Sequence, residues 1–337
     1  MSIPTQAGAP NADLTKIKLI LHPSLTYLIY LVYLTQCRRG EHRMPNTVGL
    51  LRKMATAATA ACAILVAGAN SLRAETTGER VLREGKIVIG ISNGAPWGYR
   101  GADGEPEGFH PDLIKAAFKG LGVDRVEIVV TEFGALIPGL TAQRFDAIAA
   151  GLAITPQRCE LVAFSDPDLK IADAALVAKG NPKNVHSYAQ IAANPQIRFG
   201  IGRGSVTAKN AAAAGVPEST MLLFPDIQSN VSALLTGRID VAAFSAPTVA
   251  RILSDPNVNG IERALPFQGL QENGKERFGY SAIAFRKEDG DLRDMYNSRL
   301  KLLKSDGTLA HIMAKNGFSH EEAAPDLTSE QVCAGQG

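Results

Sequence analysis

Short apolar strands alternate with amphipathic helical stretches through most of the chain, and this alternation constrains the fold more than any other feature. The strand "KIVIGI" (86–91) is followed by the helical "HPDLIKAAFKGLG" (110–122), the strand "VEIVVTEF", the short helix "GALIPGLTAQRF" and the strand "DAIAAGLAI" (146–154). The same order begins again with "IRFGIG" (197–202) and ends with "IDVAAFSA" (239–246). Parallel strands need a crossover connection, usually a helix, so the pattern predicts an α/β fold with parallel sheets covered by helices.

A short internal echo indicates that the chain has two similar halves. The segments "QRFDAIAAGLA" and "GRIDVAAFSAP" align with Arg144 over Arg238 and Asp146 over Asp240. Each half therefore places an arginine, an apolar residue and an aspartate where a helix leads into a strand. Coincidence of α/β patterning is the alternative. After residue 278, a strand-like "GYSAIAFRK" and one charged helix (291–317) are too short for a domain, and we expect them to pack on the first half.

Charge is distributed unevenly between the first 74 residues and the rest of the chain. The first 74 hold 8 Lys and Arg and 2 Asp and Glu, which leaves 27 basic and 31 acidic residues in the other 263. A nucleic-acid binder places a basic stripe in its folded part, so this distribution argues against nucleic acid as a partner.

The same N-terminal region resembles a targeting sequence. From Met44, "MPNTVGLLRKMATAATAACAILVAGANSLRA" has a basic start, an apolar stretch and a small residue, Ala74, at its end, as in a secretory signal peptide. We therefore expect residues 44–74 to be removed on export to the periplasm, and residues 1–43 to come from a start codon assigned too early. A buried core helix and a lipid anchor at Cys62 are the alternatives.

Two of the four cysteines follow this leader, Cys159 and Cys333. A lone pair in an oxidising compartment suggests one disulfide, which would tie the C-terminal tail to the region just after Arg158. Two independent buried thiols are the alternative. The histidines are isolated and lack the short spacing of metal ligands, so we expect no metal.

Four segments together resemble the successive signatures of a known family. "GKIVIGI", "GEPEGFHPDLIKAAFKGLG", "LIPGLTAQRFDAIAAGLAITPQRCELVAFSDP" and "GRIDVAAFSAP" resemble periplasmic solute-binding proteins of polar amino-acid ABC importers, from about Lys86 to Cys333. The resemblance implies a two-lobed periplasmic binding protein fold of type II, with parallel-sheet lobes joined by a two-strand hinge. Lobe 1 would comprise residues 85–174 plus 279–333, and lobe 2 residues 175–278.

Within that family, "TEFGALIPGL", "AAGLAITPQRCE" and the terminal cysteine most resemble the ectoine- and hydroxyectoine-binding members. The resemblance implies that Arg158 grips the ligand carboxylate, which suits a planar, always charged guanidinium. It places Gly151 and Ala153 at the strand end that lines the cleft, although ordinary amino-acid binders often carry Ser or Thr in place of Ala153. Trp97 and Phe133 match its aromatic wall, where ring faces attract a delocalised cation; core packing is the alternative for both rings.

The second half contributes two further candidate positions. The loop "GIGRGSVTA" leaves a strand and enters a helix, so backbone N–H groups around Gly204, Ser205 and Val206 would face a negative group. Ser245 stands where amino-acid binders of the family carry an Asp for the ligand's ammonium, so a standard amino acid should bind poorly. Gly94 stands where ectoine binders often carry an acid, which leaves the contacts to the ligand's ring nitrogens undefined.

These residues indicate a binding protein and not an enzyme. We expect it to close on a small zwitterion, ectoine or hydroxyectoine, and to deliver it as a monomer to an ABC permease and its ATPase, without a cofactor. A polar amino acid or a betaine-like solute is an alternative ligand. A periplasmic dehydratase on this fold would need a general acid in the cleft. The nearest acid, Glu132, alternates with Phe133 and should face away. A receptor sensor domain is a further alternative.

Overall fold

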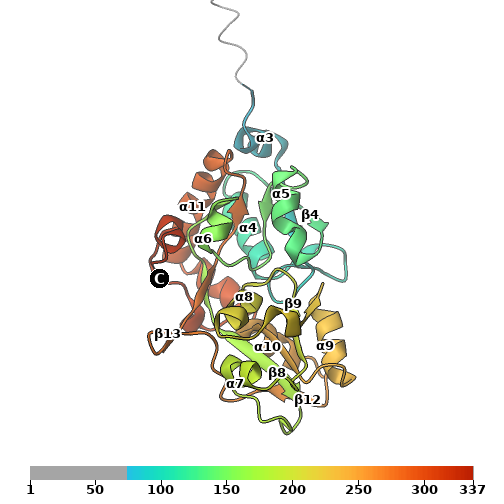
Figure 1. The fold of residues 1–337 in the computed structure, drawn as a ribbon. Helices are drawn as coiled ribbons and strands as arrows, with labels where there is room; N and C mark the ends of the chain where they lie inside the picture. The colour runs from blue at the N-terminus through green and yellow to red at the C-terminus, as the bar shows by residue number, and fades with distance from the viewer. Residues whose placement is uncertain (1–73, 337) are drawn as a thin grey trace, which may run out of the picture. The chain divides into compact units, whose positions relative to one another are not determined.

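The computed structural model describes residues 74–336, which are drawn in colour in Figure 1. The expected start-site extension (1–43) and all of the expected signal peptide except Ala74 lie outside the described residues, as do Cys37 and Cys62. Among the described residues, no helix has the length and apolar character needed to cross a membrane.

The first lobe is built on a five-stranded sheet. In spatial order its strands are β4 (Arg125–Val130), β1 (Lys86–Ile91), β5 (Ala147–Ile148), β16 (Ala284–Phe285) and β6 (Ala163–Phe164). Strand β1 pairs in parallel with β4 and β5, whereas β16 runs antiparallel to β5 and β6. Alternate residues of β1 enter different cores: Ile87, Ile89 and Ile91 join one hydrophobic cluster, and Val88 packs against the other. Both faces of this sheet are therefore covered.

The second lobe repeats this plan. Its strands are β10 (Met221–Phe224), β9 (Phe199–Gly202), β11 (Val241–Ser245), β8 (Asp173–Ala178) and β12 (Ile261–Arg263). Strands β10, β9 and β11 are parallel, and β8 is antiparallel to β11 and β12. Contrary to expectation, the sheets are therefore not parallel throughout, because one strand in each lobe is antiparallel to its neighbours. The reversed strands, β8 and β16, follow directly on the hinge, so they start at the hinge and run away from it.

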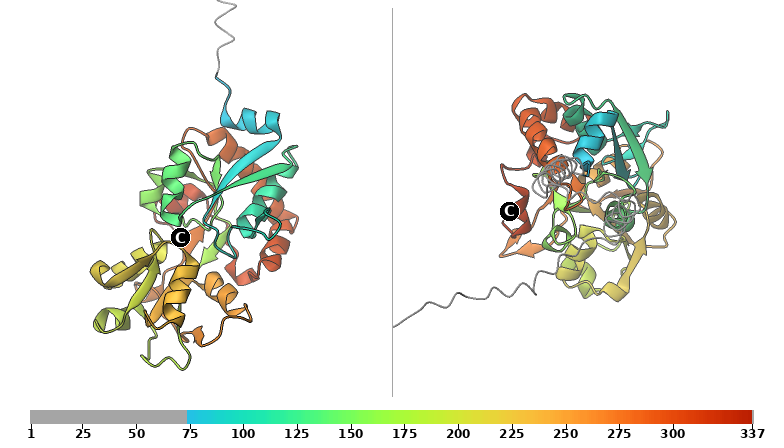
Figure 2. Two further views of the ribbon diagram at one scale, coloured as in Figure 1. Left: turned by 90° about the vertical axis from the view of Figure 1, so that its right-hand side faces the viewer. Right: turned by 90° about the horizontal axis from the view of Figure 1, so that it is seen from above.

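The hinge is the antiparallel pair β7 (Leu169–Ile171) and β15 (Gly279–Ser281), in agreement with the expected two-strand connection. Two smaller hairpins pair β2 (Tyr99–Arg100) with β3 (Pro106–Glu107) and β13 (Gln271–Glu272) with β14 (Lys275–Glu276). Figure 2 shows the two lobes in two further orientations.

Helices flank both sheets (Figures 1 and 2). They are α3 (Thr77–Glu84), α4 (Phe109–Lys119), α5 (Leu136–Thr141), α6 (Pro156–Cys159), α7 (Tyr188–Ala193), α8 (Val206–Ala213), α9 (Ile227–Leu235), α10 (Ala246–Leu253), α11 (Gly290–Ser305), α12 (Thr308–Lys315) and α13 (Ser329–Cys333), with short 3-10 turns at Phe133–Ala135, Glu218–Thr220 and His320–Glu322. The single helix expected over 291–317 is two helices, because Gly307 adopts φ 83° between α11 and α12. Both share one hydrophobic cluster with α4, so the C-terminal unit packs on the first lobe, as expected.

The sequence echo corresponds to a contact that occurs once in each lobe. Asp146 Oδ2 accepts the backbone N–H of Val88 at 3.0 Å, and Asp240 Oδ2 accepts that of Arg198 at 2.9 Å. Val88 lies in β1, and Arg198 directly precedes β9. Each aspartate therefore precedes one parallel strand, β5 or β11, and binds the backbone of the strand that pairs with it, at Val88 in β1 or just before β9, which explains the repeated spacing.

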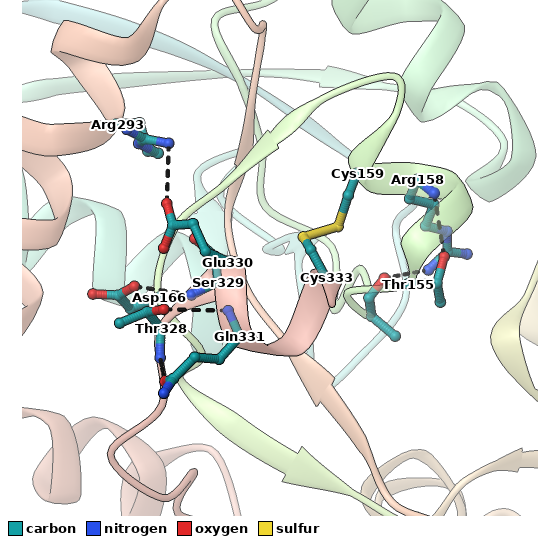
Figure 3. The surroundings of a disulfide bond; sticks show 11 residues. Thr155, Arg158, Cys159, Asp166, Arg293, Thr328, Ser329, Glu330, Gln331 and Cys333 are labelled. Atoms are coloured by element: carbon teal, nitrogen blue, oxygen red, sulfur yellow. Dashed lines mark hydrogen bonds and ion pairs between the residues drawn. A yellow bond between two sulfur atoms is a disulfide. The ribbon is translucent and has the colours of Figure 1, made fainter. Parts of the chain in front are cut away.

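A disulfide joins Cys159 in α6 to Cys333 in α13, the two cysteines that the sequence analysis pairs (Figure 3). Further contacts hold α13 in place: the Ser329 N–H donates to Asp166 Oδ1 at 3.1 Å, and Arg293 lies 3.7 Å from Glu330. The C-terminal tail is thus fixed beside the short helix that carries Arg158.

Candidate functional site

A cleft lies where the carboxyl ends of parallel strands from both lobes meet, the usual place for ligands in open α/β sheets. It contains about 870 Å³ of empty space, including its open mouth. Residues at or just beyond six strand ends line it: Ser92, Phe133, Ala150, Arg203, Pro225 and Ser245.

The structure gathers most of the residues that the sequence singles out. Trp97, Phe133, Gly151, Ala153, Arg158, Ser205, Val206 and Ser245 all line this cleft, as does Gly94. Gly204 does not line the cleft, but its carbonyl contacts Arg158.

Arg158 enters the cleft from α6, which begins after the N-cap Thr155 (Figure 3). Its guanidinium donates to the carbonyls of Ala153 at 2.7 Å and Gly204 at 2.9 Å, so it touches both lobes. No carboxylate forms an ion pair with Arg158 among residues 74–336. Burial lowers the pKa of Arg158 to about 10, because its charge is taken out of water without a counter-ion. The side chain is thus a desolvated cation that an anionic ligand group would neutralise.

Two aromatic side chains of the first lobe line the cleft together with Arg158. The Phe133 ring centroid lies 5.8 Å from the guanidinium carbon, and this ring is half-buried at the end of β4. Trp97 is only 6% exposed and packs on His110 and Phe318, with ring centroids 5.7 and 5.2 Å away. Trp97 is therefore both part of the first lobe's core and part of the cleft wall.

The indole of Trp97 also contacts the second lobe. Its Nε1–H donates to Thr248 Oγ1 at 3.1 Å, with Ser245 Oγ at 3.4 Å, and the two hydroxyls lie 2.8 Å apart. Thr248, in the first turn of α10, is a site residue that sequence reasoning missed. Ser245 is therefore engaged with Trp97 and Thr248, and it is not a free hydroxyl.

The loop before α8 differs from the expected anion-binding arrangement. The Ser205 N–H donates to the Gly202 carbonyl at 3.2 Å and so is used within the turn, and the Gly204 carbonyl accepts from Arg158. The Ser205 side chain caps α8 by accepting the Ala208 N–H at 3.1 Å. Val206 and Thr207 occupy the first two helical positions, where N–H groups have no intrahelical acceptor. Ser205 thus gives its N–H to the turn, whereas Val206 keeps its expected position in the first turn of the helix.

Gly151 allows the first lobe's wall to close on Trp97. Its φ is 68°, and a Cβ there would overlap the indole ring. Its N–H donates to His110 Nδ1 at 3.0 Å, and His110 Nε2 lies 3.1 Å from Asp168 Oδ2, with both side chains fully buried. Asp168 directly precedes hinge strand β7 and accepts from Ser281 of β15. A buried polar network therefore fixes the cleft backbone relative to the hinge.

Asp173 is an acid in the cleft that sequence reasoning did not identify. It begins β8, lines the cleft, and is 8% exposed. Its Oδ2 accepts from Tyr188 Oη at 3.0 Å and from Asn210 Nδ2 at 2.9 Å. Burial raises the pKa of Asp173 from 3.8 to about 6, and the nearby Glu276 adds to the rise, while the two hydrogen bonds oppose it. The available signal was an aspartate at the start of an otherwise apolar strand, "DAALVA".

Glu132, the acid weighed for an enzymatic role, is exposed and lies 3.5 Å from Arg203 across the mouth of the cleft. It therefore faces solvent, as expected from its alternation with Phe133. The described part of the chain contains no group of three or more His, Cys, Asp or Glu side chains arranged to hold a metal ion.

Comparison with known proteins gives concordant matches. Residues 87–319 match the bacterial extracellular solute-binding proteins, family 3. A Sinorhizobium fredii protein named as a probable amino-acid ABC transporter periplasmic-binding protein is 35% identical over 281 residues, 82% of this chain and 92% of that protein. The histidine-binding periplasmic protein of Salmonella typhimurium is 31% identical over 235 residues, covering 68% and 86% of the two chains.

Two solved structures are also similar. The crystal structure of EhuB in complex with hydroxyectoine matches with a TM-score of 0.71 and 38% identity, covering 78% of this chain and 100% of that one. An ancestral amino acid-binding protein, AncCDT-1, described as a precursor of cyclohexadienyl dehydratase, matches with a TM-score of 0.63 and 26% identity, covering 72% and 99%.

Proposed function

Since this chain belongs to the bacterial extracellular solute-binding proteins of family 3, the solute-binding components of amino-acid-type ABC importers, we propose that it captures a small zwitterion in the cleft between its lobes. The observation that carries the proposal is Arg158, a buried guanidinium with two carbonyl contacts and no counter-ion within residues 74–336. A ligand carboxylate would supply that counter-ion through two parallel hydrogen bonds. Gly151, Ala153 and Phe133 shape the wall beside it.

Closure of the lobes is the proposed mechanism of capture. Arg158 and Trp97 reach from the first lobe to Gly204 and Thr248 of the second. A ligand held by Arg158 from one side and by the N–H groups of Val206 and its neighbours from the other favours the closed state by its differential affinity. A permease can then recognise the closed form.

Ectoine or hydroxyectoine is the proposed ligand. The likeness to EhuB at 38% identity supports it, as do the aromatic rings of Trp97 and Phe133, whose faces suit a delocalised cation. A polar amino acid is one alternative ligand, and the likeness to the histidine-binding protein favours it. A betaine-like solute is another.

The remaining assignments complete the transport role. The protein acts in the periplasm as a monomer after removal of residues 44–74, with lobe 1 formed by 85–174 plus 279–333 and lobe 2 by 175–278. It passes its solute to an ABC permease with its ATPase and needs no cofactor. Its relatives are named as periplasmic binding proteins, which supports this location.

Thermal shift against a panel of small zwitterions tests the proposal. A ligand that binds only the folded state stabilises it by RT ln(1 + [L]/Kd), about 2.7 kcal/mol at a hundredfold excess over Kd. We expect ectoine or hydroxyectoine to raise the melting temperature of ligand-free protein, and acetate, which has the carboxylate alone, to leave it unchanged. If no zwitterion in the panel raises the melting temperature, the proposal is contradicted.

A dehydratase is the second candidate, and Asp173 is the observation in its favour. A buried carboxyl group with a pKa of about 6 is suited to protonate a leaving hydroxyl, and a similar solved structure is described as a dehydratase precursor. Incubation with prephenate separates the two roles. We expect no conversion of prephenate. If wild type converts it and Asp173→Asn does not, the protein is a dehydratase instead.

A further inference from the structure

We propose that Asp173 accepts a hydrogen bond from a positively charged N–H group of the solute, so that the cleft selects cations with an N–H over quaternary ammonium groups. The inference rests on the proposed capture of a zwitterion and adds the chemistry of its positive end.

The register of the second sheet positions Asp173 for this role. Across the antiparallel pair β8 and β11, Asp173 stands directly opposite Ser245. Directly opposed residues project to the same face of a sheet. Ser245 and Asp173 both line the cleft, so this face is the one turned toward the ligand. The carboxylate that position 245 lacks is therefore supplied by the neighbouring strand.

Hydrogen bonds hold the carboxylate in one orientation and leave one oxygen available. Tyr188 of α7 and Asn210 of α8 both donate to Oδ2, at 3.0 and 2.9 Å. Among the described residues, Oδ1 has no protein donor, and no basic side chain forms an ion pair with Asp173. Asp173 is only 8% exposed, and its Oδ1 is not one of the fully buried atoms that lack a partner, so this oxygen keeps a small accessible surface in the cleft. Closure on a ligand would remove that surface from water, and a ligand N–H would supply the hydrogen bond in its place.

The cleft thus presents two buried charges of opposite sign, and no residue in the described part of the chain neutralises either of them. Arg158 comes from the first lobe and Asp173 from the second. A zwitterion placed between them satisfies both and links the lobes. The other carboxylate at the cleft, Asp226, is exposed and accepts the Ser229 N–H as N-cap of α9, so it has a structural partner.

The requirement for an N–H follows from the chemistry of the free oxygen. Charge-assisted N–H···O bonds are short, about 2.7 to 2.9 Å, and are roughly twice as strong as neutral ones. A quaternary ammonium has no such donor, and its methyl groups keep its charge away from Oδ1. It would desolvate the carboxylate without giving it a hydrogen bond.

Titration calorimetry at pH 7.5 with three probes tests the inference. Ectoine carries N–H groups on its cation, and proline carries two on its ring ammonium; proline betaine keeps the ring and carboxylate of proline but has no N–H. Whichever of ectoine and proline binds wild type more tightly serves as the N–H probe. We expect wild type to bind this N–H probe at least about tenfold more tightly than proline betaine. Asp173→Asn should weaken that probe at least about tenfold, a loss of about 1.4 kcal/mol or more, and change proline betaine less than about threefold. Asparagine still accepts from Tyr188 and Asn210. The control Asp124→Asn, at an exposed aspartate outside the cleft, should bind like wild type.

A second measurement needs no variant. Asp173 faces Tyr188 and Asn210, with Glu276 of β14 as the nearby titratable acid. Protonation of Asp173 at acidic pH turns the acceptor into a neutral acid. The affinity of wild type for the N–H probe should therefore fall as pH drops below about 6, relative to proline betaine.

The outcomes separate this inference from the proposed function. Equal binding of the N–H probe by wild type and Asp173→Asn, or preference of wild type for proline betaine, overturns the role of Asp173 and leaves zwitterion capture intact. Wild type that binds none of these probes overturns both.

Discussion

Asp173 and Ser245 lie directly opposite each other where β8 pairs with β11, and both line the cleft. We propose that Asp173, on the adjacent strand, takes the place of the acid that the family resemblance leads one to expect at position 245. A pocket inferred from Ser245 alone would contain the buried positive charge of Arg158 and no buried acid. With Asp173 it contains buried charges of both signs, so an ammonium has a counter-charge there, and ligand choice depends on N–H groups and shape.

Replacement of Arg158 by lysine should weaken ligand binding although the charge is kept. Lysine loses the planar fork that donates to Ala153 and Gly204 and would leave ligand carboxylate oxygens underpaired. Breaking a buried charge pair costs about 2 to 5 kcal/mol. Calorimetry should show at least about a thirtyfold higher Kd. Arg125→Lys, an exposed arginine on β4, is the control and should match wild type. Unchanged affinity in Arg158→Lys would remove this residue from the site.

Asp173→Asn should stabilise the ligand-free protein at neutral pH. The pKa of Asp173 is raised in the folded state to about 6 from 3.8, so its ionisation costs folding free energy. This cost is absent below pH 3.8, grows as the pH rises from 3.8 to about 6, and is constant at higher pH. Each pKa unit corresponds to about 1.4 kcal/mol, so the variant should gain about 1 to 3 kcal/mol. Urea melts at pH 4 and 7.5 should show the gain only at the higher pH. A less stable variant at pH 7.5 contradicts this reading.

Gly151→Ala should displace Trp97 and reduce both stability and binding. An alanine there must adopt φ 68°, and its Cβ would overlap the indole ring. Strain and overpacking of this kind cost about 1 to 3 kcal/mol each. Thermal melts and the tryptophan emission spectrum report the change directly, since Trp97 is the sole tryptophan. Gly180→Ala, at φ 81° with no atom near its Cβ, is the control for strain alone. Equal effects in the two variants would mean that the contact with Trp97 contributes nothing.

Reduction of the disulfide between Cys159 and Cys333 should lower the melting temperature. The bond closes a loop with a sequence separation of 174 residues, and a link of this kind stabilises by about 2 to 5 kcal/mol through the unfolded chain. Protein from the periplasm should show no free thiol when denatured without reductant. Two titratable thiols in fresh material would refute the link, and the double variant Cys159→Ser with Cys333→Ser should match the reduced protein.

The hydrophobic pattern of the sequence predicts a strand or helix correctly where the pattern lies within one segment. Strand β1 occupies 86–91 as expected, because its apolar run is continuous and both its faces are buried. The strand expected over 146–154 is regular only at Ala147–Ile148, because the chain turns at Gly151 to reach Trp97. The antiparallel direction of β8 and β16 could not be predicted, since it follows from passage through the hinge.

Some site residues can likewise be predicted from the sequence, and others cannot. Arg158 is recognisable from its motif, and Trp97 and Phe133 from the strands that they follow. Asp173 is not, because its place beside Ser245 depends on the register between two strands about 70 residues apart in sequence. The N–H of Ser205 was misassigned because a tight turn to Gly202 uses it. Sequence periodicity does not encode such contacts.

Competitive titration of refolded, ligand-free protein with ectoine, hydroxyectoine, proline betaine, glutamine, histidine and arginine tests the central claim most directly. We expect micromolar or tighter binding of ectoine or hydroxyectoine, held between Arg158 and Asp173, and displacement of any weaker solute by either one. Micromolar binding of glutamine, histidine or arginine, with none of the cyclic solutes bound, would contradict the ligand assignment and leave the binding-protein fold unchanged.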